Sequence, residues 1–364
     1  MKLSLTNFAV LISICLLWPI HHCYSQALTN SKSVVTNYNA AFDSLNKLAQ
    51  SNGSFSDAVF LVENAYYGNS LSKENFDRIT NYLTELCLQN AQLQSIGNYK
   101  FADSANFRTN LSIFNTLFDT TIIVGSNGNG LKRVVPYSYN HSDPFGKMDW
   151  SNMFVSKLLS SRTGNCHSLT YLYKIISDKI TSTKCWLSLA PSHLYIRNYS
   201  LHYGWYNSEL TSASFPTDAW IMASGYVTPD AIRSGLYMDT LSNVQSIALC
   251  LTDLAKGYEI QTKEIDDGFI LKCCELALMY HPNNPMALLQ KAETLQKIYL
   301  KQKQLNDPKQ EVTYQLMSSA YIYLATLGYR EMPEKMYLQW ISEAKKSDGQ
   351  FKSQSPHSPK KKAF

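Results

Sequence analysis

Residues 164–176 read Gly-Asn-Cys-His-Ser-Leu-Thr-Tyr-Leu-Tyr-Lys-Ile-Ile, and this run sets the architecture of the middle of the chain. Within it, apolar residues stand at i, i+3, i+4 and i+7, which is the spacing of one helix face: Leu169, Leu172, Tyr173 and Ile176. The spacing predicts an amphipathic helix that begins at or near Cys166. A shorter helix, from Met153 to Leu159, is expected just before it.

Three short strands are expected after this helix. Alternation of apolar and polar residues predicts strands over Cys185 to Leu189 and over His193 to Arg197, and a third over Trp205 to Leu210. His193 then opens the second strand, and Glu209 lies on the third. The expected order is a cysteine at a helix start, then a histidine and an acid on neighbouring antiparallel strands.

This order suits nucleophilic chemistry at Cys166. A thiol attacks as its thiolate, which the unpaired amides and the dipole at a helix N-terminus stabilise. A nucleophilic cysteine also needs a base within hydrogen-bond reach, and the base needs a group that orients its second nitrogen. His193 follows Cys166 by 27 residues and Glu209 follows His193 by 16, which is compatible with helix, strand and adjacent strand. The hypothesis requires the Cys166 sulfur to lie beside the His193 ring and to be reachable from water.

Two segments of this region resemble a known family. Gly164-Asn165-Cys166 at the head of an apolar helix, followed by Ala190-Pro191-Ser192-His193-Leu194-Tyr195-Ile196-Arg197, is similar to the transglutaminase-like superfamily. The similarity spans roughly Ala58 to Lys297 and is to a bacterial branch in which such a domain is joined to tetratricopeptide-like helices.

The resemblance implies a papain-like fold with Cys/His/Asp chemistry, in which Cys166 is the nucleophile and His193 the base. The third position is occupied here by Glu209, whereas the family usually has aspartate. Asp218 is the alternative acid and Asn207 a weaker one. Some members of the superfamily lack an assigned activity, so the resemblance is more specific for fold than for catalysis.

Each candidate also has a structural interpretation. A cysteine near an apolar helix is usually buried and inert, and only the preceding Gly-Asn and the downstream histidine favour a site. His167 points about 100° away from Cys166 on the helix, so we expect it to contact solvent or a loop. A zinc site from Cys166, His167, His193 and His202 is disfavoured because paired ligand spacing is missing from the sequence. We expect no metal and no other cofactor.

Helices flank this middle region. We expect an α+β protein in which residues 26–120 form an N-terminal helical region, residues 121–226 a transglutaminase-like core, and residues 227–350 a helical-repeat region. Phe269 to Tyr280, a Pro/Asn turn, and Ala287 to Tyr299 read as one tetratricopeptide-like unit, with a second pair expected over Tyr314 to Leu327 and Glu334 to Lys345. Gly125 to Gly130 is expected to be a loop, and residues 351–364 a disordered basic tail.

The first 25 residues indicate export. Lys2, an apolar run from Phe8 to Ile20, and small residues up to Ser25 form the three parts of a secretory signal, with cleavage expected before Gln26. The apolar run is short for a membrane span, so we expect no stable span after cleavage. Export to the periplasm or the medium is the expected localisation.

The bulk composition restricts the class of partner. The chain has 364 residues, 45% of them hydrophobic and 17% charged, and a net charge of +5 that is partly concentrated in its last residues. These values are typical of a globular protein and do not indicate a nucleic-acid surface. The expected partner is a protein or peptide.

Two functions remain open at this point. In the first, Cys166, His193 and an acid act on an amide or isopeptide bond, with hydrolysis favoured over cross-linking because water needs no dedicated acceptor site. In the second, the site is inactive, and the repeat helices and the aromatic middle region bind a protein or peptide as a scaffold.

Overall fold

The computed structural model describes residues 32–124 and 131–333, together with residues 335, 336, 339 and 342. The predicted signal peptide, the Gly125 to Gly130 loop, the basic tail and most of the Glu334 to Lys345 helix lie outside the described residues. The described part is mixed α and β, with helices predominating and three small sheets.

A three-stranded antiparallel sheet packed on one helix forms the centre. The strands β5 (Trp186–Ala190), β6 (His193–Ser200) and β7 (Gly204–Ser208) lie in the order β5-β6-β7. Helix α6 (Cys166–Asp178) packs against β6, where the hydroxyl of Thr170 donates to the Leu194 carbonyl at 3.2 Å. The alternation of β6 places the buried Leu194 and Ile196 on one face and His193 on the other.

The predicted strands differ from the observed ones only at their ends. The second strand extends beyond Arg197 to Ser200, because a tight turn at Gly204 carries β6 directly into β7. Glu209 was expected within the third strand but lies just after β7, where its backbone exchanges two hydrogen bonds with Ser214. The edge of β5 is covered by the segment after α8 (Pro229–Arg233), since Met238 and Leu241 donate backbone hydrogen bonds to the carbonyls of Leu189 and Leu187.

The chain before α6 builds the opposite side of the centre. The elements in order are α3 (Lys73–Leu93), α4 (Ser104–Phe118), β1 (Thr121–Val124), β2 (Leu131–Val134), β3 (Ser138–Tyr139), the 3-10 turn η1 (Trp150–Met153), α5 (Val155–Ser161) and β4 (Thr163–Gly164). Strands β1 and β2 pair as a hairpin, and β3 pairs in parallel with β4 immediately before Cys166. The single helix expected over Met153 to Leu159 is thus η1 followed by α5.

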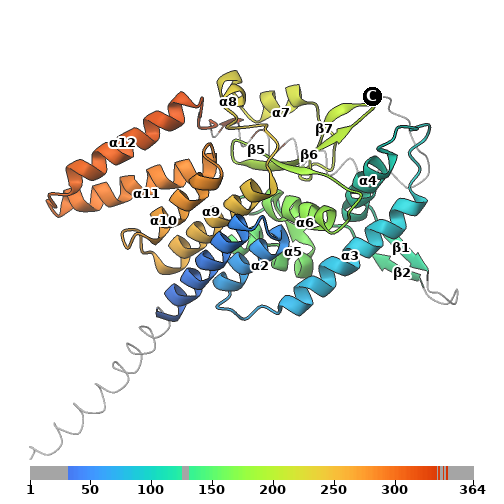
Figure 1. Cartoon of the computed structure of the whole chain (residues 1–364), viewed down its shortest axis with the longest axis horizontal. Helices are drawn as coiled ribbons and strands as arrows, with labels where there is room; N and C mark the ends of the chain where they lie inside the picture. The colour runs from blue at the N-terminus through green and yellow to red at the C-terminus, as the bar shows by residue number, and fades with distance from the viewer. Residues whose placement is uncertain (1–31, 125–130, 334, 337–338, 340–341, 343–364) are drawn as a thin grey trace, which may run out of the picture.

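Helices from both ends of the chain pack against each other. The helix over residues 32–50 and α2 (Phe55–Tyr66) lie beside α9 (Asn243–Thr262) and α10 (Phe269–Tyr280), so the regions expected over 26–120 and 227–350 share one hydrophobic core (Figure 1). The Tyr38 ring meets Tyr258 edge-on at 5.3 Å. Helix α9 is apolar around most of its circumference, as a helix enclosed by others must be.

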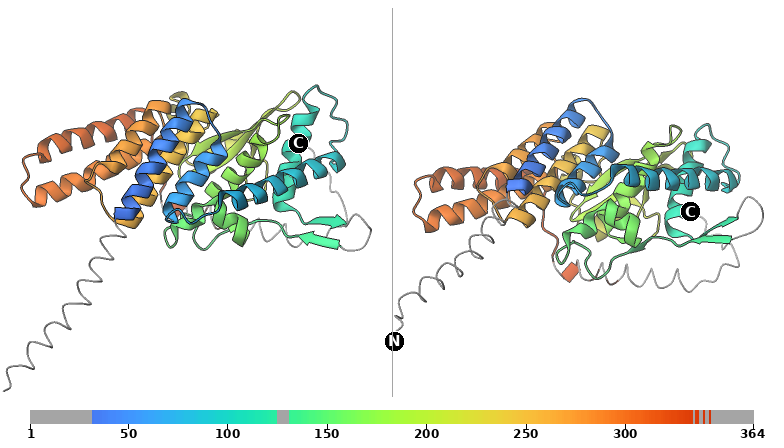
Figure 2. Two further views of the ribbon diagram at one scale, coloured as in Figure 1. Left: turned by 60° about the horizontal axis from the view of Figure 1, so that its bottom comes forward. Right: turned by 90° about the horizontal axis from the view of Figure 1, so that it is seen from below.

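The remaining helices complete the C-terminal side. Helices α7 (Asp218–Ser224) and α8 (Pro229–Arg233) lie beside the sheet, and α11 (Pro285–Gln304) and α12 (Gln310–Thr326) extend outward from α10 (Figures 1 and 2). The predicted α10, turn and α11 agree closely with the observed helices. Asn284 caps α11, and Pro285 occupies its first turn, where the missing N–H of proline costs nothing.

Candidate functional site

Cys166 is the first residue of α6, and the residue before it caps that helix. The Asn165 side chain accepts hydrogen bonds from the backbone N–H groups of His167 at 3.1 Å and Ser168 at 3.2 Å. The Ser168 hydroxyl in turn accepts from the Asn165 N–H at 3.1 Å, which completes a capping box. The thiol is therefore held at the positive end of a well-capped helix, where negative charge is stabilised.

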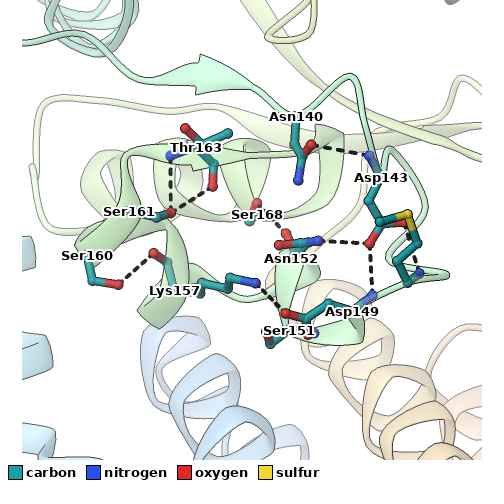
Figure 3. Close-up of polar contacts among 11 residues, drawn as sticks. Asn140, Asp143, Asp149, Ser151, Asn152, Lys157, Ser160, Ser161, Thr163 and Ser168 are labelled. Atoms are coloured by element: carbon teal, nitrogen blue, oxygen red, sulfur yellow. Dashed lines mark hydrogen bonds and ion pairs between the residues drawn. The ribbon is translucent and has the colours of Figure 1, made fainter.

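A polar loop between β3 and η1 supports this helix start. Asp143 accepts from the backbone N–H groups of Met148 and Asp149 and, at 2.8 Å, from the Asn152 side chain (Figure 3). The Asn152 carbonyl then accepts from the Ser168 hydroxyl at 3.2 Å. The loop is thus internally bonded and joined to the first turn of α6.

His193 and Glu209 form a buried pair beside the helix start. Nε2 of His193 lies 2.6 Å from Oε2 of Glu209, and the two side chains are 8% and 2% exposed. The other oxygen of Glu209 accepts from the Thr211 backbone N–H at 2.8 Å, which fixes the carboxylate. Nε2 is therefore the ring nitrogen that Glu209 engages.

The thiol of Cys166 hydrogen-bonds with His193, and the two groups change each other's pKa. Burial alone raises the pKa of Cys166, but the charge and hydrogen bond of His193, together with the Leu194 N–H, outweigh it and lower that pKa. Burial likewise opposes protonation of His193, but Glu209 and then Cys166 raise its pKa. Burial raises the pKa of Glu209, but the charge and hydrogen bond of His193 and the hydrogen bonds of Thr211 together outweigh burial and lower that pKa. These directions favour a thiolate and imidazolium pair oriented by a carboxylate.

The other cysteines in the described residues have the opposite character. Burial raises the pKa of Cys87 and Cys185 to about 12, and it raises those of Cys250, Cys273 and Cys274 as well. All five are buried free thiols. Cys166 is therefore chemically distinct from each of them.

An apolar pocket lies against the His193 and Glu209 side of the site. Its lining includes Pro191, Trp220, Ile221 and Met332, and Met332 comes from the segment that follows α12. Cys166 itself retains only 7% exposure. The sulfur is nearly enclosed, so a reagent reaches it only if the surrounding wall opens.

The alternative acids do not contact the His193 ring nitrogen that Glu209 occupies. Asp218 forms an ion pair with Arg197 at 3.0 Å, and its other oxygen accepts from the Asn207 side chain at 2.7 Å. Of the three candidates, Glu209 is the one that contacts Nε2 of His193. The extra methylene of glutamate lets a residue just beyond the end of β7 reach back to the ring.

The four residues weighed as a zinc set separate into three places. Cys166 and His193 are together, while His202 lies in the β6–β7 turn and stacks on Phe101 at 5.0 Å. His167 was expected to contact solvent or a loop, but it is buried and contacts the carbonyl of Met153, the last residue of η1, and Asp253 of α9. Among the described residues, no three or more histidine, cysteine or acidic side chains are grouped to hold a metal ion.

The sequence does not predict a contact between Asp253 and His167, because 86 residues separate the two partners. One signal was present: Asp253 is an isolated acid in the buried run Ile247 to Ala255, and a buried acid needs a partner. The cap at Asn165 also has a local signal, since asparagine before a helix with serine three residues later is typical of a helix N-terminus.

Comparison with known protein families, with curated proteins and with solved structures finds no match for this chain. Within the part of the chain that the structure describes, no helix combines the length and apolar character of a membrane span.

Proposed function

We propose that this chain is an exported cysteine-dependent acyl-transfer enzyme with a transglutaminase-like, papain-like core, which hydrolyses an amide or isopeptide bond in a protein or peptide. The observation that carries the proposal is the position of His193, which contacts the Cys166 thiol on one side and Glu209 on the other. The resemblance implies a cysteine, a histidine and an acid in this order, and Glu209 stands at the position where the family usually has aspartate.

Each residue has a defined role in the proposed reaction. The Cys166 thiolate attacks the amide carbonyl carbon, and the His193 imidazolium gives its proton to the departing amine as the C–N bond breaks. His193 then takes a proton from water, whose oxygen attacks the thioester; the C–S bond breaks, the acid is released, and the Cys166 thiolate and the His193 imidazolium are regenerated. Glu209 remains ionised and holds the ring orientation. The Cys166 backbone N–H, at the first position of α6, is placed to stabilise the developing oxyanion.

The pocket beside His193 supports a substrate with an apolar side chain near the scissile bond. Pro191, Trp220 and Ile221 line it with largely apolar surface, and a substrate group bound there lies next to the base. Hydrolysis is favoured over cross-linking because a water molecule suffices as the acceptor.

A scaffold function is the second candidate, and the surface of α12 favours it. This helix exposes several large apolar side chains: Val312, Leu316, Ile322 and Tyr323. Exposed apolar side chains gathered on one helix mark a contact surface for another protein. If the Cys166 site is catalytically inactive, the exposed apolar surface of α12 is the functional part of the protein.

Alkylation by iodoacetamide at pH 7, read for each cysteine by peptide mass spectrometry, tests the enzymatic proposal. Cys166 is expected to react at least about tenfold faster than Cys185 in the folded protein, since one pKa unit corresponds to a factor of ten. Equal rates for the two thiols contradict the activated thiolate. New amine termini in denatured casein, lost in Cys166→Ala and retained in Cys185→Ala, identify hydrolysis, whereas incorporation of dansylcadaverine identifies transfer.

A further inference from the structure

His167, the residue after the nucleophile, belongs to a second buried polar cluster on the far side of α6. Its Nδ1 lies 2.9 Å from the Met153 carbonyl oxygen, and its Nε2 lies 3.1 Å from each carboxylate oxygen of Asp253 in α9. Tyr171, one turn further along α6, donates its hydroxyl to the same carboxylate at 2.9 Å. The side chains of His167 and Asp253 are 8% and 5% exposed.

The partners of His167 determine its protonation state. A carbonyl oxygen only accepts hydrogen bonds, so Nδ1 must carry a proton. Nε2 faces both carboxylate oxygens of Asp253, so a protonated ring donates to that carboxylate as well. Burial opposes the protonated form, but the charge and hydrogen bond of Asp253, with the Met153 carbonyl and Cys166, together outweigh burial and raise the pKa of His167.

The cluster ties the start of α6 to two other parts of the molecule. The His167 ring is anchored to the η1–α5 junction through Met153 and to the buried helix α9 through Asp253, while its backbone N–H is held by Asn165. The charged groups that face it are Asp253, Glu63 and Cys166. A shift of α9 relative to α6 therefore displaces the residue directly after the nucleophile.

We propose that His167 and Asp253 are positioning residues, which join the helical bundle to the first turn of α6 and so couple the bundle to the orientation of the nucleophile. This inference rests on the proposed function for its catalytic meaning. The direct physical effect is on the Cys166 thiol, whose alignment with His193 depends on the first turn of α6. Displacements of about 1 Å at such a distance can change a reaction rate by up to roughly 100-fold.

The chain offers a matched pair of aspartates for the test. Asp253→Asn keeps the shape of the side chain but replaces an acceptor-only group with an amide that cannot present two acceptors to His167. Asp267→Asn is the control, because Asp267 also receives a tyrosine hydroxyl in the same bundle, that of Tyr258, and has no part in α6. Tyr171→Phe is a milder variant that removes one hydrogen bond to the Asp253 carboxylate. It keeps the test available if Asp253→Asn does not fold.

The readout is the ultraviolet titration of the Cys166 thiolate, together with the alkylation rate of Cys166 at pH 7. We expect Asp253→Asn to slow alkylation about tenfold and to raise the apparent pKa of the thiol by about one unit. Tyr171→Phe is expected to act in the same direction with a smaller effect, and Asp267→Asn to leave both values unchanged. For an assayable substrate, kcat should fall while KM stays constant, because neither residue lines the pocket beside His193.

Two outcomes overturn the inference: unchanged thiol titration in Asp253→Asn and Tyr171→Phe, or an equal change in Asp267→Asn. The proposed function fails separately, if the wild-type Cys166 titrates like an ordinary thiol. A shift of that titration by Asp253→Asn still supports the positioning role in that case.

Discussion

Oε2 of Glu209, just after the end of β7, lies 2.6 Å from Nε2 of His193 at the start of β6, and the two side chains are 2% and 8% exposed. The contact fixes the orientation of the imidazole, whose charge and hydrogen bond act on Cys166 at the head of α6. A carboxylate in this position both fixes the ring and stabilises its protonated form. The predictions below test what this relationship implies for the thiol.

Removing the charge of Glu209 is expected to weaken the thiolate. Glu209 raises the pKa of His193, so Glu209→Gln lowers that pKa and weakens the imidazolium that stabilises the Cys166 thiolate. Alkylation of Cys166 at pH 6 should fall by about tenfold, the effect of one pKa unit. Asp218→Asn, which alters a neighbouring carboxylate bound to Arg197 instead, is the control and should react like the wild type. Equal losses in both variants contradict the assignment of Glu209.

The pH range of the ion pair follows from the two pKa shifts. The depressed pKa of Cys166 means that the thiolate persists as pH falls below the ordinary range of a thiol and is lost only below the folded-state value. The elevated pKa of His193 means that the imidazolium persists above the ordinary range of a histidine and is lost as pH rises through its folded-state value. Stopped-flow alkylation from pH 4 to 10 should show an acid limb well below pH 8.5, the usual thiol value. An acid limb at that usual value contradicts the pair.

Loss of the α6 cap should affect both stability and the thiol. Asn165→Ala removes the acceptor for two backbone N–H groups, and loss of such a cap costs about 1 kcal/mol of the free energy of unfolding, measured by urea denaturation. Asn284→Ala is the matched control, because Asn284 caps α11 with the same two-bond geometry. The two variants should lose similar stability, whereas only Asn165→Ala should slow the alkylation of Cys166. If both variants slow the alkylation of Cys166, the cause is the general loss of stability and the prediction for the α6 cap is wrong.

The Met332 side chain should limit access to the site. Met332 lines the pocket next to His193 and Glu209, while Cys166 is almost enclosed. Met332→Ala is therefore expected to raise the rate of alkylation by a bulky maleimide several-fold and that by iodoacetamide less. The control is Met279→Ala, at a methionine of α10 that is 75% exposed and remote from this pocket. A rate unchanged by Met332→Ala excludes this segment from the access route.

Local patterns in the sequence predict the parts of this structure that depend on neighbours along the chain. The apolar period after Cys166 predicts α6, and the alternation around His193 predicts β6, because each pattern records one buried face of one element. Phe269 to Tyr280 agrees with α10 because a proline and asparagines end that helix sharply.

Contacts between distant residues could not be predicted in the same way. Asp253 and Met332 lie near the site because the helical bundle and the C-terminal segment pack against the centre. Local sequence periodicity does not predict contacts between such distant segments. The choice among Glu209, Asp218 and Asn207 also required coordinates, because it depends on the bend after β7 and on Arg197 holding Asp218 elsewhere. The packing of the helix over residues 32–50 against α9 and α10 is likewise a contact between distant segments that the sequence does not predict.

The most direct measurement is the difference in absorbance at 240 nm between the wild type and Cys166→Ser, recorded as a function of pH. A Cys166 thiolate paired with His193 should produce a thiolate signal that persists to pH values well below 8.5, the ordinary thiol pKa. A difference signal that appears only at or above pH 8.5 would contradict the ion pair on which the proposed chemistry depends.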